Sequence, residues 1–402
     1  AVLIDFVVGM ISTILNIKEL KSSAPRGLED VYKVDEYRKS QSYTGTQSQF
    51  GLIAGSCKLA ALLIFWFVGG FDYVDQTIRA AGWNDIWTGL GFILCLTTFS
   101  LVLSLPFSLY GTFVIEEKFG FNKTNLSTYA LDTVKSLILS ALIGIPLLLG
   151  ILYFFEYAGS MAWLYVWVLV IVVSLVMQVI APIWIMPIFN KFTRLEEGEL
   201  KQSIMEYAER VGFTYDNVYV IDGSRRSAHS NAFFTGFGKT KRIVLFDTLI
   251  EQLNKDEIVS VIAHEVGHNK KGHILLGTAL GIVHTGALLF LLSLVLENRL
   301  LFDAFFMENT SVYASIMFFG LLFTPVDLLM SPLMQLVSRK HEYQADHWAV
   351  ETTANRQHLV SGLKKLAAKN LANLSPHPIF VILNYSHPPL SNRIEAINVA
   401  KT

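Results

Sequence analysis

The sequence predicts a mainly α-helical protein that crosses a membrane several times and carries a smaller α+β segment with a metal site. Hydrophobic residues make up 52% of the chain, charged residues only 16%, and the mean hydropathy is +0.44. A soluble protein of this length carries more charge and fewer aliphatic side chains. The apolar residues also occur in runs long enough to span a bilayer, and one histidine pair has the spacing of metal ligands on a helix.

Seven apolar runs predict seven transmembrane helices, and they lie near residues 2–17, 57–75, 88–111, 134–154, 162–186, 274–296 and 312–337. The first run is short and contains Asp5, so a cleaved signal peptide is the alternative, although no basic leader precedes it. Pro182 and Pro187 predict a kink or an early stop in the fifth run. Asp327, in the seventh, is expected to face the protein interior or a wet cavity, because a carboxylate is costly in lipid.

The cationic residues predict the orientation of these helices. Lys and Arg number 12 in residues 187–273 and 8 in 338–402, but only 1 each in 76–87 and 297–311. Cationic loops tend to remain in the cytosol, which predicts an external N-terminus, a cytosolic C-terminus and a cytosolic metal site. The net charge of −1 and the absence of a basic stripe with interleaved aromatics give no support for a nucleic-acid partner.

The polar segments contain fewer predicted elements. Residues 29–37 are expected to form a helix on the membrane surface, and the pattern EEKFGFN at 116–122 indicates no particular chemistry. In the longest segment, an amphipathic helix is predicted at 198–210, and strands at 217–222, 232–237 and 242–246, with a turn at 238–241 that makes the last two a hairpin. The hairpin edge can bind an extended peptide by strand addition, but ordinary packing explains the same pattern, and both remain open.

An HExxH motif lies in the segment that precedes the sixth apolar run. His264 and His268 are four residues apart, so on a helix both imidazoles can bind one metal ion. Glu265 can reach a metal-bound water and act as general base while that water attacks a carbonyl. Asn254 followed by Glu257 is a capping-box pattern, which predicts that the helix carrying the motif starts there.

A zinc site of this kind needs a third protein ligand. Glu342 is the stronger candidate, because Glu342 and Asp346 are four residues apart in an ExxxD pattern typical of gluzincins. Asp346 can then accept the outer N–H of a ligating histidine. His273, five residues after His268, is the weaker alternative, and His341 is expected to face away from the metal. The short loop between the last two apolar runs implies antiparallel neighbours, which would bring the two halves of the site together.

The C-terminal tail contains two further candidates, His387 and Arg393. Both side chains can donate hydrogen bonds to the oxyanion that forms when water attacks a peptide carbonyl. A turn with a capping serine before a helix at 392–399 explains the same residues and is compatible with that role.

Four motifs occur together in this chain: HEVGH at 264–268, SRKHEYQAD at 338–346, SNAFFTGF at 230–237 and SHPPLSNR at 386–393. In this combination and order the chain resembles the zinc-dependent CaaX prenyl protease 1 family of integral-membrane metalloproteases. The resemblance implies one zinc ion per chain, bound by His264, His268 and Glu342, with Glu265 as general base. It also implies that Asp346 accepts the outer N–H of a ligating histidine. It also implies an intramembrane chamber, and substrates that are prenylated CaaX proteins from which the last three residues are removed.

The resemblance further implies contacts with the substrate. Asn231, His387 and Arg393 are expected to contact the substrate or the transition state. The strand at 231–237, with Ala232, Phe233 and Phe234, is expected to receive the peptide. The site would lie on the cytosolic side of the endoplasmic reticulum membrane in a eukaryote, or of the inner membrane in a bacterium.

Two alternatives remain: an HtpX-like protease for membrane-protein quality control, and a transporter with structural zinc. A transporter is disfavoured because no internal repeat and no fourth protein ligand are evident. The oligomeric state is not predicted. The expected organisation is transmembrane helices 1–5 in residues 1–186, a catalytic segment in 187–273, helices 6 and 7 in 274–337, and a C-terminal catalytic segment in 338–402.

Overall fold

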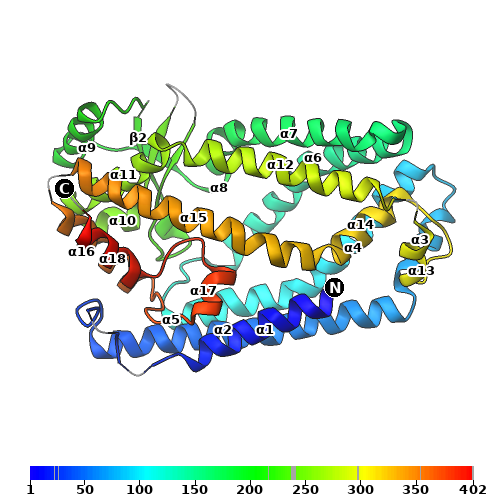
Figure 1. Cartoon of the computed structure of the whole chain (residues 1–402), viewed down its shortest axis with the longest axis horizontal. Coiled ribbons are helices and arrows are strands. Elements are labelled where there is room, and N and C mark those ends of the chain that lie inside the picture. Colours follow the sequence, from blue (N-terminus) through cyan, green and yellow to red (C-terminus); the bar gives the residue numbers. More distant parts are fainter. Residues whose placement is uncertain are drawn as a thin grey trace.

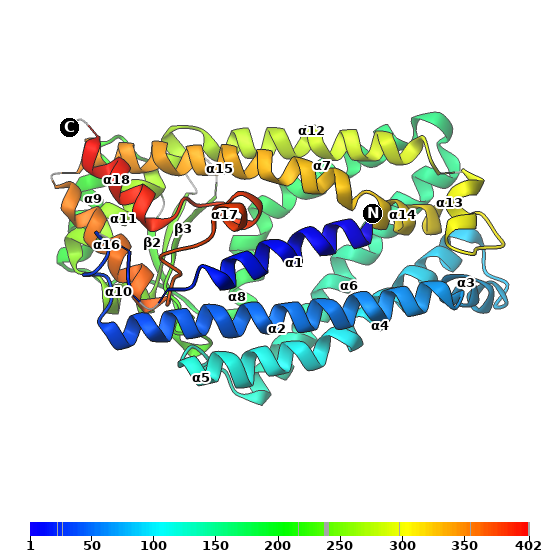
Figure 2. The ribbon, with the colours of Figure 1, turned by 60° about the horizontal axis from the view of Figure 1, so that its bottom comes forward.

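Long helices run side by side along the molecule, and a smaller α+β part closes one end (Figures 1 and 2). The structure is a computed structural model of the chain that describes residues 1–21, 23–25, 27–215, 217–236, 241–296, 298–353 and 355–400. The predicted turn at 238–241 falls mostly outside the described residues, as does Phe237 at the end of the predicted strand. The helix that carries the HEVGH motif and the sheet lie in the α+β part, near the C-terminus (Figure 1).

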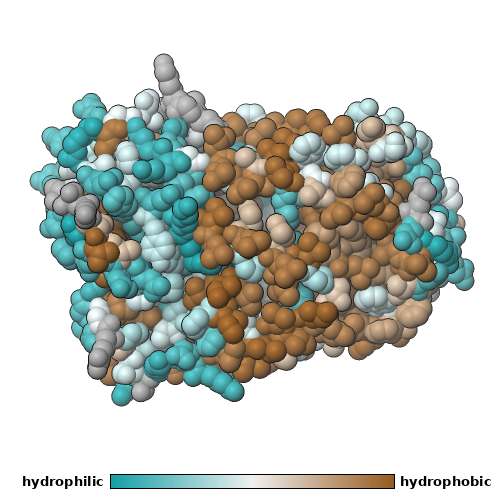
Figure 3. Space-filling view, viewed as in Figure 1, coloured by the Kyte–Doolittle hydropathy of each residue, from teal (hydrophilic) through white to brown (hydrophobic). Residues whose placement is uncertain are grey.

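Among the described residues, five helical stretches are long and apolar enough to cross a membrane: Val34–Phe67, Asp85–Phe119, Leu126–Tyr157, Gly159–Phe189 and His273–Ser293. A sixth is possible, because Val312–Leu322 and Thr324–Thr352 form a pair bent by 56°. The face of the molecule drawn in Figure 3 also fits a membrane protein, because a broad hydrophobic belt separates two hydrophilic ends. The chain is therefore a multi-pass membrane protein, as predicted.

The first predicted span forms helix α1 (Val2–Lys18), which packs against α2 (Val34–Phe67) and α17 (Pro378–Asn384). With 17 residues it is shorter than the five helical stretches that can span a bilayer, which have 21 to 35 residues. The second predicted span was misplaced. Helix α2 (Val34–Phe67) starts inside the polar segment and ends before residue 75, because Gly69, with φ +76°, turns the chain into α3 (Gly70–Arg79). Of the predicted surface helix at 29–37, only residues 34–37 are helical, as the first turn of α2, and residues 29–32 form a turn and a bend.

Prolines interrupt two of the later spans, as their chemistry predicts. Helix α7 (Ala162–Ile180) continues into a π-helix (Ala181–Ile185) that contains Pro182, and then into α8 (Met186–Phe189). The break between α14 (Val312–Leu322) and α15 (Thr324–Thr352) precedes Pro325 in the first turn of α15. A proline lacks an N–H and is tolerated in the first turn of a new helix. Helix α15 then continues without a break from the apolar run to Thr352.

The sheet has four strands in the order β1-β2-β4-β3. Strand β1 (Phe192–Arg194), which the sequence did not predict, pairs antiparallel with β2 (Asn217–Ile221). β2 runs parallel to β4 (Arg242–Phe246), and β4 pairs antiparallel with β3 (Ala232–Thr235) in the register Ala232↔Leu245. The predicted pairing of the last two strands is thus confirmed, and β3 is an edge strand of the described sheet.

The remaining helices connect these parts. Their bounds are α4 Asp85–Tyr110, a π-helix Gly111–Glu116, α5 Glu117–Phe119, α6 Leu126–Tyr157, a 3₁₀ turn Gly159–Met161, α9 Glu199–Arg210, a 3₁₀ turn Gly223–Arg225, α10 Asp247–Gln252, α11 Lys255–Lys270, α12 His273–Ser293, α13 Arg299–Ala304, α16 Arg356–Lys369, α17 Pro378–Asn384 and α18 Leu390–Val399. Helix α18 starts two residues before the predicted 392, after Pro389, and has no serine cap. The predicted amphipathic helix at 198–210 is α9.

The packing of α11 against α15 positions the site, and a glycine makes it possible. A Cβ on Gly267 would lie 3.0 Å from Cα and 3.1 Å from the carbonyl oxygen of Ala345. Backbone atoms cannot move aside as a flexible side chain can, so a larger residue would separate the two helices. The glycine of the HEVGH motif therefore lets the helix with both histidines approach the helix with Glu342.

Candidate active site

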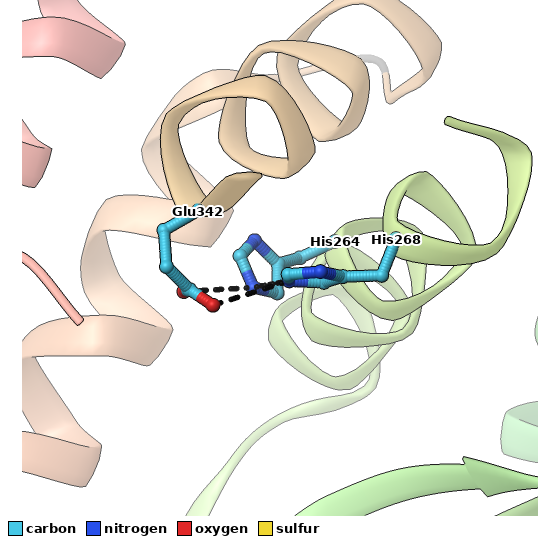
Figure 4. Close-up of side chains that lie close together, drawn as sticks. All are labelled: His264, His268 and Glu342. Atoms are coloured by element: carbon cyan, nitrogen blue, oxygen red, sulfur yellow. Dashed lines mark hydrogen bonds and ion pairs between the residues drawn. The ribbon is translucent and has the colours of Figure 1, made fainter. Parts of the chain in front are cut away.

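His264 and His268 lie on α11, and Glu342 faces them from α15 (Figure 4). The start of α11 is fixed as predicted, because the Asn254 side chain accepts the N–H of Glu257 while the Glu257 carboxylate accepts the N–H of Asn254. The Nε2 atoms of the two histidines are 3.2 Å apart. Glu342 Oε2 lies 3.4 Å from Nε2 of His264, and Oε1 lies 3.3 Å from Nε2 of His268. The two imidazole nitrogens and the Glu342 carboxylate thus converge on one point.

These donors fit a metal ion. Glu342 is only 4% exposed, and its Oε2 atom makes no hydrogen bond to any described residue. A buried carboxylate oxygen without a hydrogen bond is unfavourable unless positive charge lies nearby; Arg393 Nη1, at 3.5 Å, supplies part of it, and a bound metal ion would supply more. His264, His268 and Glu342 are also the one group of possible ligands that the described residues bring within 4.8 Å of one another. The three side chains could therefore hold a metal ion.

Asp346 and Arg393 lie behind His264. Asp346 Oδ1 is 2.8 Å from Nδ1 of His264, so the outer nitrogen of this ring faces a carboxylate. Arg393 donates to both oxygens of the same carboxylate, from Nε at 2.9 Å and from Nη2 at 2.6 Å. Burial opposes the charge of Arg393, but Asp346 and Glu342 outweigh that effect and raise its pKa. The bidentate pair between Asp346 and Arg393 was not anticipated from the sequence, since the two residues are 47 positions apart.

The structure brings Arg393 to the donor set as well, because its Nη1 lies 3.5 Å from Glu342 Oε2. His387 approaches from the loop before α18, with Nε2 at 3.3 Å from Glu342 Oε1 and Nδ1 at 2.9 Å from the Ser386 hydroxyl. Burial lowers the pKa of His387, which favours the neutral ring. If the Ser386 hydroxyl donates to Nδ1, the neutral ring carries its proton on Nε2 and directs an N–H toward the site.

His273 is close to the site but is not part of the donor set. Its Nδ1 lies 3.1 Å from Nδ1 of His268, on the side of the His268 ring that faces away from Glu342. The structure therefore places His273, the weaker alternative for the third ligand, outside the group of converging donors, because the turn at Gly272 directs it behind His268. His341 stacks on His273, with ring centroids 4.0 Å apart, and is likewise outside the donor set.

A cavity of about 150 Å³ opens beside the donors, and Glu265 and Asn231 are among the residues that line it. Burial raises the pKa of Glu265 above its ordinary value, which makes this carboxylate a better proton acceptor. Part of the cavity lining is apolar and includes Leu359, Leu363 and Leu366, which lie on one face of α16. Their spacing of four and three residues is a helical signal in the sequence, but it does not indicate that the helix lies beside the metal site.

The start of strand β3 borders this cavity, because Ala232 and the preceding Asn231 contribute to its lining. The Phe246 N–H donates to the Asn231 carbonyl at 3.1 Å, which identifies a hydrogen-bonded pair of the antiparallel ladder. Since such pairs alternate, Phe233 is bonded to β4 and Phe234 directs its N–H and C=O to the open side. The Ala232 carbonyl faces the same side, whereas its N–H is bonded to the Asn231 side chain at 2.9 Å.

A multi-pass helical membrane protein with an HExxH helix and a distal glutamate is an integral-membrane metallopeptidase. Two family models cover most of the chain: "CAAX prenyl protease N-terminal, five membrane helices" matches residues 13–191, and "Peptidase family M48" matches residues 194–401. The chain therefore belongs to peptidase family M48, and its N-terminal half has the membrane region of the CAAX prenyl proteases.

Similar proteins extend over nearly the whole chain. CAAX prenyl protease 1 from Saccharomyces cerevisiae is 36% identical, over 94% of this chain and 89% of the yeast protein. CAAX prenyl protease 1 homologs from Arabidopsis thaliana and Homo sapiens are 36% and 32% identical, each over 96% of this chain and over 94% and 90% of their own lengths. The crystal structure of S. mikatae Ste24p superposes with a TM-score of 0.93 at 35% identity, covering 98% of this chain and 97% of that one.

Proposed function

We propose that this chain is a zinc metalloendopeptidase that removes the C-terminal tripeptide from prenylated CaaX proteins. The observation that carries the proposal is the spacing of the donor atoms. Zinc binds nitrogen and oxygen ligands at roughly 2.0–2.2 Å, so two ligands at a tetrahedral angle lie roughly 3.3–3.5 Å apart. The Nε2 atoms of His264 and His268 are 3.2 Å apart, and each lies near a different oxygen of Glu342, at 3.4 Å from Oε2 for His264 and 3.3 Å from Oε1 for His268. One zinc ion per chain accounts for these distances and for the unbonded Oε2 of Glu342.

When bound, zinc supplies a Lewis acid that polarises a carbonyl and lowers the pKa of water. Glu265 lines the same cavity as the ligands, so it accepts a proton from the attacking water and delivers it to the leaving amine. Its raised pKa suits both transfers. His387 and Arg393 place nitrogens 3.3 and 3.5 Å from the Glu342 carboxylate, beside the position of the metal. When a substrate carbonyl is bound there, their N–H groups stabilise the negative charge that develops on its oxygen. Asp346 holds the His264 ring in the tautomer that presents Nε2 to the metal.

Strand β3 supplies a binding edge for the substrate backbone, with Asn231, Ala232, Phe233 and Phe234 as the contact residues. An extended peptide that adds to this edge gains main-chain hydrogen bonds from the open groups of Ala232 and Phe234. The leucines of α16 then contact the substrate side chain that enters the cavity beside the metal. An aliphatic wall of this size favours a branched aliphatic side chain, and a CaaX tail has such a residue next to its prenylated cysteine.

The proposal also includes the number and arrangement of the transmembrane helices. We propose seven transmembrane helices, with α1 as the first and the bent pair α14 and α15 as the last, around a chamber in the membrane. A cavity of about 720 Å³ between α1, α2, α15 and α17 supports this, and Asp327 lines it, as expected for a carboxylate that avoids lipid. In the proposed division, 1–186 and 274–337 form the membrane part, and 187–273 and 338–402 form the gluzincin-like catalytic part. The catalytic part is cytosolic, in the endoplasmic reticulum membrane of a eukaryote or the inner membrane of a bacterium.

The proposal is tested with purified protein and two variants, Glu265→Gln and Glu342→Gln. We expect about one zinc ion per wild-type chain, and cleavage of a farnesylated CaaX peptide but not of its unprenylated twin. Glu265→Gln is expected to keep zinc and to lose activity by several orders of magnitude, because the variant can neither accept a proton from the water nor pass it to the leaving amine. Glu342→Gln is expected to lose zinc as well.

Three outcomes would overturn parts of this proposal. Full zinc occupancy in Glu342→Gln would mean that another residue is the third ligand. Full activity in Glu265→Gln would mean that another group is the base. Equal cleavage of both peptides would mean that the prenyl group is not recognised and would favour general membrane proteolysis instead.

A further inference from the structure

His268 has two nitrogens, and they face different partners. Its Nε2 lies 3.3 Å from Glu342 Oε1 and belongs to the donor set. Its Nδ1 lies 3.1 Å from Nδ1 of His273, which is the first residue of α12. His273 in turn places Nε2 at 2.8 Å from Oε1 of Gln344, on α15. Three side chains from three helices are thus connected in a line that ends at the proposed metal ligand.

Only one arrangement of protons satisfies every contact in this line. A ligating Nε2 must present a lone pair, so neutral His268 carries its proton on Nδ1 and donates it to His273. Nδ1 of His273 must then be the acceptor, which leaves the proton of His273 on Nε2. That N–H points at Gln344 Oε1, which is an acceptor. The direction of donation is therefore from His268 through His273 to Gln344.

The surrounding structure holds His273 in this position. Gly272 has φ +71°, a left-handed conformation that glycine adopts readily, and it turns the chain from α11 into α12 directly after the motif helix. The side chain is buried, with His273 6% exposed, and its ring lies flat against His341 at an interplanar angle of 6°. A ring fixed by a turn, by burial and by stacking has little freedom to rotate away from His268.

We propose that His273, supported by Gln344, is a positioning residue that fixes the tautomer and ring orientation of His268 and thereby raises the affinity of the site for zinc. This inference rests on the proposed function, because it assumes that His268 is a zinc ligand. It gives the two ligating histidines different partners: His264 donates to the charged Asp346, and His268 donates to a neutral imidazole. Outer partners of ligating histidines commonly contribute 10- to 100-fold in metal affinity.

Two substitutions at position 273 separate the hydrogen bond from the packing. His273→Leu keeps an apolar side chain but removes the acceptor, and we expect zinc affinity to fall about 10- to 100-fold. His273→Asn places an oxygen near the former Nδ1 position, and we expect it to restore affinity to within about threefold of wild type. Zinc affinity is measured in detergent by competition with a chromophoric chelator, and the thermal midpoint of the metal-free protein is measured alongside to report on packing.

Gln344 and His341 provide the second pair of variants. Gln344→Leu removes the last acceptor and is expected to weaken zinc binding less than His273→Leu, whereas Gln344→Glu keeps an acceptor and the affinity. His341→Phe preserves the stacked ring without any contact to His268 and is the matched control, with affinity expected within twofold of wild type. If His273→Leu does not fold, the zinc affinities of His273→Asn and Gln344→Leu are compared instead. The inference then requires weaker zinc binding in Gln344→Leu than in His273→Asn.

The inference is overturned if His273→Leu binds zinc as tightly as wild type, or if His273→Asn is as weak as His273→Leu. Either result would leave the proposed function intact, provided that the wild-type protein binds zinc and cleaves peptide. Failure of the wild-type protein to bind zinc would instead overturn the proposed function itself. The two failures are therefore distinguishable in the same set of measurements.

Discussion

Oδ1 of Asp346 lies 2.8 Å from Nδ1 of His264, one helical turn after Glu342, whose carboxylate faces Nε2 of the same ring. Two carboxylates of α15 therefore face the two ring nitrogens of one imidazole. Two carboxylates four residues apart share a helix face, and the ring inserts between them. This arrangement explains how α15 can both complete a metal site and orient a ligand that belongs to another helix.

Replacing Asp346 with Asn is expected to weaken zinc binding about 10- to 100-fold, because the ring of His264 loses its charged acceptor. Arg393, which is 9% exposed, would also lose its carboxylate partner, at a cost of roughly 3–5 kcal/mol in stability. Zinc affinity and the thermal midpoint are measured together. Glu351→Gln on the same helix is the control, because Glu351 is exposed and pairs only with His347 among the described residues. Unchanged zinc affinity in Asp346→Asn would contradict the assigned role.

Adding one methyl group to Gly267 is expected to separate α11 from α15. The new Cβ would meet the backbone of Ala345 at 3.0 Å and the Cβ of Trp348 at 3.1 Å. Overpacking of this kind costs roughly 1–3 kcal/mol, and it also moves His268 away from Glu342, so zinc affinity falls as well. Gly277→Ala on α12 is the control, because a Cβ there meets no atom within 4 Å. If Gly267→Ala matches Gly277→Ala in both stability and zinc affinity, the close approach does not limit the site.

If substrates bind β3 by strand addition, N-methylation of the substrate backbone is expected to act with a period of two residues. Only alternate N–H groups of an added strand face its partner, so methylation of those groups raises KM while methylation of their neighbours does not. A series of farnesylated peptides, each methylated at one amide, tests this by measuring kcat and KM. An effect that does not alternate along the peptide would exclude pairing with the edge of β3.

Glu257 is expected to make folding stability depend on pH in acid. Burial alone would raise its pKa, but hydrogen bonds from Lys365, Ser361 and the Asn254 N–H outweigh burial and lower the pKa below its ordinary value of 4.5. The unfolded chain therefore binds this proton more readily, so the stabilisation is present above about pH 4.5 and is lost as pH falls through the folded-state pKa.

Glu257→Gln is expected to destabilise the protein by roughly 1–2 kcal/mol at neutral pH and to reduce the acid-dependent loss of stability. The thermal midpoint is measured from pH 7 to pH 3.5, and exposed Glu251→Gln serves as the control. Identical pH profiles for Glu257→Gln and wild type would show that the capping box and the Lys365 pair do not cause the loss of stability in acid.

Local patterns in the sequence account for most of the site. The capping box at Asn254 predicts where α11 begins, and four-residue spacing predicts that His264 and His268 share a face, as do Glu342 and Asp346. These features depend on helical periodicity and on hydrogen bonds within one turn, and the chain carries that information in neighbouring residues. The apolar runs likewise determine that the protein is a multi-pass membrane protein.

Features that depend on contacts between distant segments were decided only by the tertiary structure. Helix α2 extends into a polar stretch because Tyr37 and Tyr43 are buried against other parts of the chain, which hydropathy does not reveal. His273 has the spacing of a possible ligand, yet the turn at Gly272 directs it to the outer nitrogen of His268. Arg393 reaches Asp346, and the leucines of α16 reach the cavity, only because packing brings α15, α16 and α18 together. Periodicity assigns residues to a face of an element, but only packing determines which element that face meets.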